Sequence, residues 1–165
     1  MSVTLRPTHE PDLDWVTALE RRPDHVDIIG QWSDAEHLAA IRRSGGREHW
    51  IMERDGRPAG YLIAYDCRAA DAGIYVKRIL VAEKGRGTGR AALAAFLESA
   101  FARGGVDSVW LIVRDGNDRA RAVYGSLGFA PFEPEGEEAT RRYDRVAEAP
   151  ADRCYRMRLE LSRRR

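Results

Sequence analysis

The sequence has little cysteine, no long apolar run and almost no net charge. Its two cysteines, Cys67 and Cys154, are too few and too unpatterned for a disulfide framework or a metal site, so we expect no metal and a reducing compartment. No stretch approaches the roughly twenty apolar residues of a membrane span, and the N-terminus lacks a signal-peptide pattern. Because 27 basic residues stand against 26 acidic ones, the charge balance implies no nucleic-acid or membrane partner. We expect a cytoplasmic protein.

The length and the apolar pattern indicate a single mixed-sheet α/β domain over residues 1–165. With 44% hydrophobic residues, the chain can bury one core. Alternating or continuous apolar runs predict about seven strands, at 3–6, 49–54, 59–65, 74–81, 108–113, 129–132 and 155–161. Helical spacing predicts about four helices, at 11–20, from Ser33 to the pair Gly45-Gly46 with Leu38 and Ile41 facing inward, at 87–102 and at 118–127.

Residues 133–153 show neither a helical nor a strand period. The stretch contains an acidic run at 133–138 and the basic pair Arg141-Arg142. About twenty residues without periodicity are unusual inside a domain unless they are mobile or functional. We predict a long polar loop there.

A glycine-rich loop joins the fourth predicted strand to the helix at 87–102. The helix is indicated by i, i+3, i+4, i+7 and i+8 spacing in Leu93, Phe96, Leu97, Ala100 and Phe101. Free backbone N–H groups and the positive end of the helix dipole converge at its first turn, and glycine lets an anion approach the backbone. Lys84, Arg86 and Arg90 add positive charge. The segment predicts a phosphate-bearing ligand.

Spacing separates this loop from two other phosphate loops. A P-loop needs Gly-Lys followed by Ser or Thr, which this stretch does not contain. A dinucleotide fingerprint counted from Gly85 needs glycine where Arg90 stands, and no second βαβ half follows. The remaining pattern is basic-x-x-Gly-x-Gly, filled by Lys84, Gly87 and Gly89. Taken alone, the pattern also fits a turn that binds no ligand.

A second motif follows at 117–129 and reads Asn-Asp-Arg-Ala-Arg-Ala-Val-Tyr-Gly-Ser-Leu-Gly-Phe. Asn117 is a typical helix N-cap, and Gly128 can end the helix. In this order, about thirty residues apart, segments 79–90 and 117–129 resemble the two motifs of the GCN5-related N-acetyltransferase (GNAT) family. The resemblance implies a GNAT fold with a largely antiparallel twisted sheet. It also implies direct transfer of an acetyl group from acetyl-coenzyme A (acetyl-CoA) to a primary amine, without a covalent enzyme intermediate.

The resemblance implies how acetyl-CoA is held. In the family the pyrophosphate lies on the glycine loop, and the pantetheine and thioester follow backbone groups at the end of the fourth strand, where the fourth and fifth strands splay apart. The motif asparagine often contacts the pantetheine or an ordered water. The cofactor-binding residues implied for this chain are Ile79, Leu80, Val81, Lys84, Gly85, Arg86, Gly87, Thr88, Gly89, Arg90 and Asn117.

Tyr124 is the candidate catalytic residue, as the general acid that protonates the leaving thiolate. A phenol titrating at about 10 can protonate a thiolate titrating at about 8.5 when it is held against the sulfur. Tyr124 also lies on the apolar stripe of its helix, with Ala120, Val123 and Leu127, so packing is the alternative explanation. Helix capping likewise explains Asn117, and the two roles of that residue are compatible.

No general base can be assigned from the sequence. Relatives that acetylate ribosomal proteins have a glutamate five residues before the motif asparagine, where this chain has Ile112. Other members have a glutamate in the fourth strand, which here reads Ile-Tyr-Val-Lys-Arg at 74–78. Glu53, Asp66 and His49 are the remaining candidates, and a water relay through backbone carbonyls is the alternative to all three.

The resemblance implies an acceptor site at the first two helices and the loop between them. This nominates Ile29, Gln31 and Trp32, with the loop at 133–153 closing over them, although Trp32 equally suits a core anchor. Small amines, aminoglycosides, amino acids and protein N-termini all stay open as acceptors. A tRNA-acetylating toxin of the same fold and a non-catalytic coenzyme A sensor are the alternative functions. Many relatives form dimers, so a homodimer is expected.

Overall fold

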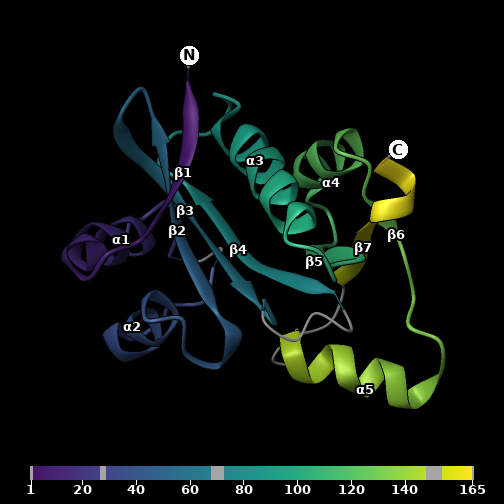
Figure 1. The fold of residues 1–165 in the computed structure, drawn as a ribbon. Helices are drawn as coiled ribbons and strands as arrows, with labels where there is room; N and C mark the ends of the chain where they lie inside the picture. Colours follow the sequence, from purple (N-terminus) through teal and green to yellow (C-terminus); the bar gives the residue numbers. More distant parts are fainter. Residues whose placement is uncertain (1, 27–28, 68–72, 148–153, 165) are drawn as a thin grey trace.

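The computed structural model describes residues 2–26, 29–67, 73–147 and 154–164 (Figure 1). Its strands are β1 (Val3–Pro7), β2 (Glu48–Arg54), β3 (Arg57–Tyr65), β4 (Ile74–Val81), β5 (Ser108–Arg114), β6 (Ala130–Pro131) and β7 (Cys154–Glu160). They form one seven-stranded sheet in the order β1-β2-β3-β4-β5-β7-β6. Only β4 and β5 pair in parallel. The predicted mixed, largely antiparallel sheet is confirmed.

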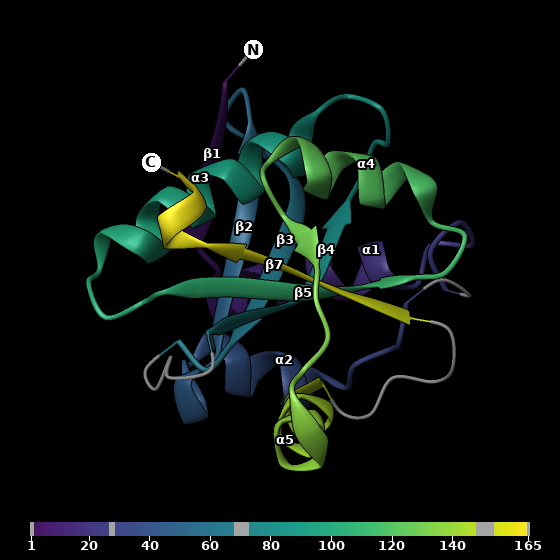
Figure 2. The ribbon, with the colours of Figure 1, turned by 90° about the vertical axis from the view of Figure 1, so that its right-hand side faces the viewer.

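Helices cover both sides of the sheet. The α-helices are α1 (Leu13–Glu20), α2 (Asp34–Ile41), α3 (Thr88–Ala102), α4 (Asp118–Ser126) and α5 (Gly136–Ala147). α1 and α2 lie on one side, and α3 and α4 lie on the other (Figure 1). α5 lies away from α3 and α4, below the end of the sheet (Figure 1 and Figure 2). Within the described ranges, no helix has the length and apolar character needed to cross a membrane.

Each side of the sheet has its own hydrophobic core. On one side, Leu93 and Phe96 of α3 pack with Val76 of β4. On the other, Val16 of α1 packs in a cluster that includes Tyr61 of β3. Because successive strand residues point to opposite faces, both cores draw on the same strands. The sheet is therefore fixed from both sides.

One helix lies where the sequence predicted a loop. α5 occupies Gly136–Ala147, so the prediction of a loop at 133–153 is wrong for these residues, while 148–153 lie outside the described residues. Its apolar stripe is narrow: Ala139, Tyr143 and Val146 are half-buried at i, i+4 and i+7 spacing along a mostly charged helix. The ring centroid of Tyr143 lies 4.7 Å from that of Trp110, which anchors α5 on the second core.

The second predicted helix differs in its buried face and in its end. α2 opens on the predicted capping box. Its fully buried residues are His37 and Ala40, whereas Leu38 and Ile41 are half-buried. The helix ends at Ile41, and the glycine pair lies in a separate 3-10 turn at Ser44–Gly46. The inward face is therefore partly polar, which an apolar pattern does not reveal.

β4 and β5 separate soon after they meet. Only Ile74 and Tyr75 of β4 pair with β5. On the other edge of β4, the pairing with β3 skips Lys77, which makes this residue a β-bulge. Figure 2 shows β5 and β7 running across the direction of β2, β3 and β4. Beyond Tyr75, the edge of β4 that faces β5 has no strand partner among the described residues, as the resemblance implies.

Candidate active site

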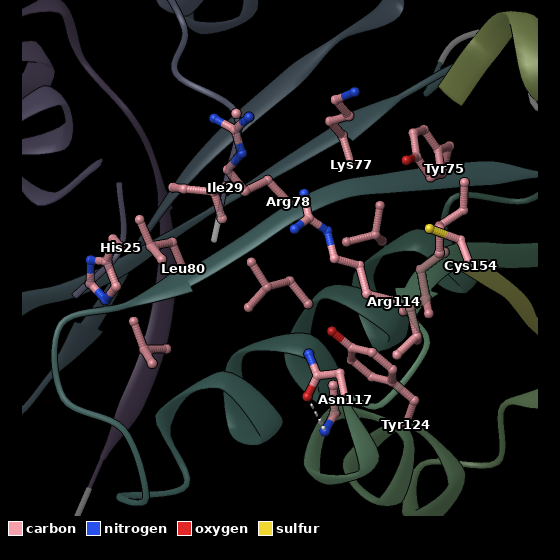
Figure 3. A pocket seen from close by; sticks show the side chains of 18 of the residues that line it. His25, Ile29, Tyr75, Lys77, Arg78, Leu80, Arg114, Asn117, Tyr124 and Cys154 are labelled. Atoms are coloured by element: carbon pink, nitrogen blue, oxygen red, sulfur yellow. Dashed lines mark hydrogen bonds between the residues drawn. The ribbon is translucent and has the colours of Figure 1, made fainter. Parts of the chain in front are cut away.

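A cavity of about 530 Å³ opens where β4 and β5 separate (Figure 3). Its walls come from β4, the end of β5, the start of α4 and the segment between α1 and α2. The sequence-predicted site residues that line it are Ile29, Ile79, Leu80, Val81, Lys84, Asn117 and Tyr124. The fold thus gathers the end of β4, the motif asparagine and the motif tyrosine around one space.

The glycine loop leads from the end of β4 into α3. Lys84 lines the cavity, whereas 85–90 do not. Gly87 is the N-cap of α3 with φ 74°, and a Cβ there would meet no atom within 4 Å. Thr88 is buried, and the N–H groups of the first helical turn have no acceptor within the helix. An anion therefore has an open approach to these N–H groups.

The basic side chains of this loop differ in how far they are engaged. Arg86 Nη1 lies 2.8 Å from Glu83 Oε2, and Arg90 Nε donates to Ser126 Oγ at 3.0 Å. Lys84 forms no ion pair with any residue that the structure describes. The ammonium of Lys84 is thus the loop charge most available to a ligand.

Tyr124 of α4 points its hydroxyl into the cavity (Figure 3). Its ring packs against the core under α3, with its centroid 6.0 Å from that of Phe129. Burial raises the pKa of Tyr124, so the phenol keeps its proton at neutral pH. Packing and access to the cavity are both present, and the side chain presents an O–H to whatever the cavity binds.

Asn117 caps α4, as predicted. Its Oδ1 accepts a hydrogen bond from the Ala120 backbone N–H at 3.2 Å. The same side chain lines the cavity. The cap therefore fixes the asparagine at the cavity wall.

The three residues expected at the acceptor site lie in different places. Ile29 lines the cavity, but Gln31 and Trp32 do not. The Gln31 amide donates to the Glu20 carbonyl oxygen at 3.0 Å. Trp32 is 7% exposed, and the guanidinium of Arg78 lies 5.4 Å from its ring centre. Trp32 is thus a core anchor, the alternative that the sequence had left open.

A buried polar network, which the sequence did not reveal, meets the cavity at Arg78. Glu20 of α1 is 1% exposed, and its Oε1 lies 2.6 Å from Tyr61 Oη, 2.6 Å from Arg78 Nη1 and 2.9 Å from His37 Nε2. Burial acts to raise the pKa of Glu20, but the hydrogen bonds from His37 and Tyr61 and the charge of Arg78 outweigh it and lower the pKa. Glu20 is therefore an anion that holds Arg78 at the cavity wall.

Two histidines and a threonine extend this network. His37 Nδ1 lies 3.1 Å from His49 Nε2, and His49 Nδ1 lies 2.8 Å from Thr8 Oγ1. The proton positions on the two imidazole rings decide which atom donates in each of these contacts. The contacts link Thr8 and His49, through His37, to Glu20.

Acid should destabilise the fold through His49. Burial lowers the pKa of His49 to about 3, whereas the unfolded chain titrates at about 6.5, so the unfolded state binds more protons between these values. Stability is therefore highest above pH 6.5 and should fall by about 2 kcal/mol between pH 7 and pH 5. Urea unfolding across this range measures the slope. His49→Gln should flatten it, the exposed His9→Gln should not, and a slope that survives His49→Gln would contradict the assignment.

None of the three residues considered as general base lines the cavity. Glu53 pairs with Arg6 at 2.7 Å, Asp66 follows the end of β3, and His49 lies in the buried network. The lining, as far as the structure describes it, contains no Asp or Glu. Over the same described residues, no group of three His, Cys, Asp or Glu side chains could hold a metal ion.

The fold is similar to that of solved acetyltransferases. The spermidine N-acetyltransferase from Vibrio cholerae in complex with CoA and spermine gives a TM-score of 0.75 at 18% identity, over 98% of this chain and 96% of that one. Aminoglycoside acetyltransferase AAC(6')-Ib in complex with coenzyme A gives 0.75 at 20% identity, over 98% and 96%. The ribosomal-protein-S18-alanine N-acetyltransferase from Escherichia coli gives 0.69 at 21%, over 97% and 94%.

Sequence comparison identifies the family. No curated protein sequence matches the chain significantly. A family model described as "Acetyltransferase (GNAT) family" matches residues 12–129, which is well over half of the chain. This match confirms the predicted acyltransferase activity, and the coenzyme A complexes of similar structures agree with acetyl-CoA as co-substrate. The chain therefore belongs to the GNAT family of acetyltransferases.

Proposed function

We propose that this chain transfers the acetyl group of acetyl-CoA to a primary amine by direct attack, with Tyr124 as general acid. The observation that carries the proposal is the cavity between β4 and β5, which gathers the end of β4, Asn117 and Tyr124. The similar enzymes act, by their names, on spermidine, aminoglycosides or a ribosomal protein. From the family resemblance we further infer a homodimer that works in the cytoplasm.

Each part of acetyl-CoA is assigned to a different group of residues along β4 and at its ends. The N–H groups at the start of α3 and the ammonium of Lys84 bind the pyrophosphate. Backbone groups at 79–81, which have no described partner on β5, hold the pantetheine, and one N–H there polarises the acetyl carbonyl as charge develops on its oxygen. Tyr124 gives its proton to the departing sulfur. Asn117 lines the same cavity and contacts the pantetheine.

The proton of the attacking amine leaves through water in this proposal. The described lining offers no carboxylate, and the backbone carbonyls freed where β4 and β5 separate can order a water chain. The amine therefore attacks as its free base.

Turnover tests the proposal directly. The protein is incubated with acetyl-CoA and a panel of primary amines while free thiol is followed and the product is identified by mass. We expect amine-dependent thiol release. Saturable binding of acetyl-CoA without turnover of any amine would instead favour a coenzyme A sensor.

Replacing Gly87 with valine should weaken acetyl-CoA binding by about tenfold or more, because a β-branched residue is strained at positive φ and shields the N–H groups of the first helical turn. Calorimetry measures the dissociation constant. Gly104→Val is the matched control, since Gly104 has φ 76°, equally open space and a place after the far end of α3. Equal affinities of the two variants would remove the loop from the binding site.

A further inference from the structure

Arginine and lysine side chains are concentrated in the lining of the cavity. The basic residues there are Lys77, Arg78, Lys84 and Arg114, and no Asp or Glu occurs in the described lining. Lys84 belongs to the glycine loop, beyond the segment 79–81 that we assign to the thioester. Lys77 and Arg78 precede that segment on β4. The phosphates of acetyl-CoA therefore account for Lys84, whereas Lys77 and Arg78 lie on the other side of the thioester.

Arg78 lines the cavity from the face of β4 that α1 covers, where its guanidinium is held between Glu20 and Trp32. Its Nη1 donates to Glu20 Oε1 at 2.6 Å, and its side chain is 7% exposed. Arg78 lines the cavity and Glu20 does not, so a molecule inside lies against Arg78 and is separated from the carboxylate. A guanidinium has five N–H donors in a rigid fork, and the bond to Glu20 uses only part of this set. Arg78 can therefore bind a second anion.

Arg114 approaches the same space from the opposite strand. It lies at the end of β5, and its side chain extends across the opening toward β4 (Figure 3). The residue is exposed, and its side chain forms no ion pair or hydrogen bond with a described residue. Arg78 already has Glu20 as its counter-ion, whereas the Arg114 side chain pairs with no described residue. A negative group at the opening would therefore gain the charge of Arg114 and further N–H donors from Arg78.

We propose that the acceptor carries an anionic group, a carboxylate or a phosphate, near its amine, and that Arg78 and Arg114 bind this group. The inference rests on the proposed function, because it specifies the second substrate of that reaction. Spermidine and aminoglycosides are polycations, which this lining disfavours. The chain therefore shares a fold with enzymes named for such substrates but selects the opposite charge.

Matched amines test the proposal. One pair is serine and serinamide, another is phosphoethanolamine and ethanolamine, and spermidine is the polycation. We expect kcat/KM, corrected for the fraction of free amine, to be about 10- to 100-fold higher for an anionic member than for its neutral partner. The pair with the larger ratio identifies carboxylate or phosphate as the bound group.

Two substitutions separate the acceptor from the donor. Arg114→Gln should remove most of the preference for the anionic amine and leave the affinity for acetyl-CoA unchanged. Lys84→Gln should weaken acetyl-CoA binding and keep the preference. Calorimetric titration of the preferred anionic amine into the coenzyme A complex gives a readout that needs no turnover, and Arg114→Gln should weaken that binding about tenfold or more.

Each outcome bears on a defined claim. Equal rates within both pairs, or a preference for spermidine, would overturn the anionic acceptor and leave acetyl transfer standing. An unchanged preference in Arg114→Gln would overturn the role of that arginine. Acetyl-CoA binding without acetylation of any amine would overturn both this inference and the proposed function.

Discussion

Replacing Tyr124 with phenylalanine should lower kcat by about 10²- to 10⁴-fold, the range of a lost general acid, while the affinity for acetyl-CoA stays unchanged. The ring and its packing under α3 remain, so only the O–H that points into the cavity is lost. Single-turnover kinetics with the best amine of the panel measure the chemical step apart from binding.

Tyr155→Phe is the matched control for this substitution. Tyr155 is an exposed tyrosine on β7 whose hydroxyl donates to Asp115 at 3.2 Å, outside the cavity. It should turn over at the wild-type rate. If Tyr124→Phe did so as well, the leaving thiolate would need no proton from the protein, and Tyr124 would be a packing residue.

Replacing Glu20 with glutamine should destabilise the fold by about 3–5 kcal/mol, because it leaves the buried guanidinium of Arg78 without its anion. His37 and Tyr61 lose part of their acceptor at the same time. For a chain of this length, the thermal midpoint should fall by roughly 10 °C. Calorimetry or circular dichroism on heating measures the change.

Glu10→Gln removes the same charge from an exposed pair with Arg42 and should leave the midpoint nearly unchanged. Adding Arg78→Met to Glu20→Gln should recover part of the lost stability, since the unpaired charge is then gone. A Glu20→Gln protein as stable as the wild type would show that the network does not hold α1 to the sheet.

The strands and the two motifs were predictable because their signals are local. Alternation over four to eight residues marks a strand, and a glycine loop before a helix marks an anion site wherever the chain goes next. α5 was missed because its local signal is weak: the apolar residues Ala139, Tyr143 and Val146 are scattered among charged ones. The stripe can hold the helix on the core because Tyr143 packs on Trp110, which lies in a distant part of the sequence.

The Glu20 network lay outside such reasoning. Glu20 and Arg78 are 58 positions apart, and His37 and His49 come from two further elements. Each reads in the sequence as an ordinary surface residue, since buried charges are rare without partners and no pattern names the partner. Only the fold shows that they meet. The charge of the cavity lining could not be predicted from the sequence either, because it depends on which basic residues the fold brings to the cavity.

The bulge at Lys77 has a consequence for how this sheet could change. Val76 and Ile79 face the same core although they are three positions apart, an odd spacing that a regular strand does not allow. The extra residue absorbs the difference, and β4 leaves β5 there. Deleting Lys77 would restore a regular β4. The strand could then pair with β5 beyond Tyr75, which would add hydrogen bonds between the strands and close the opening. Under the proposed function, such a deletion would add strand pairing at the expense of the acetyl-CoA site.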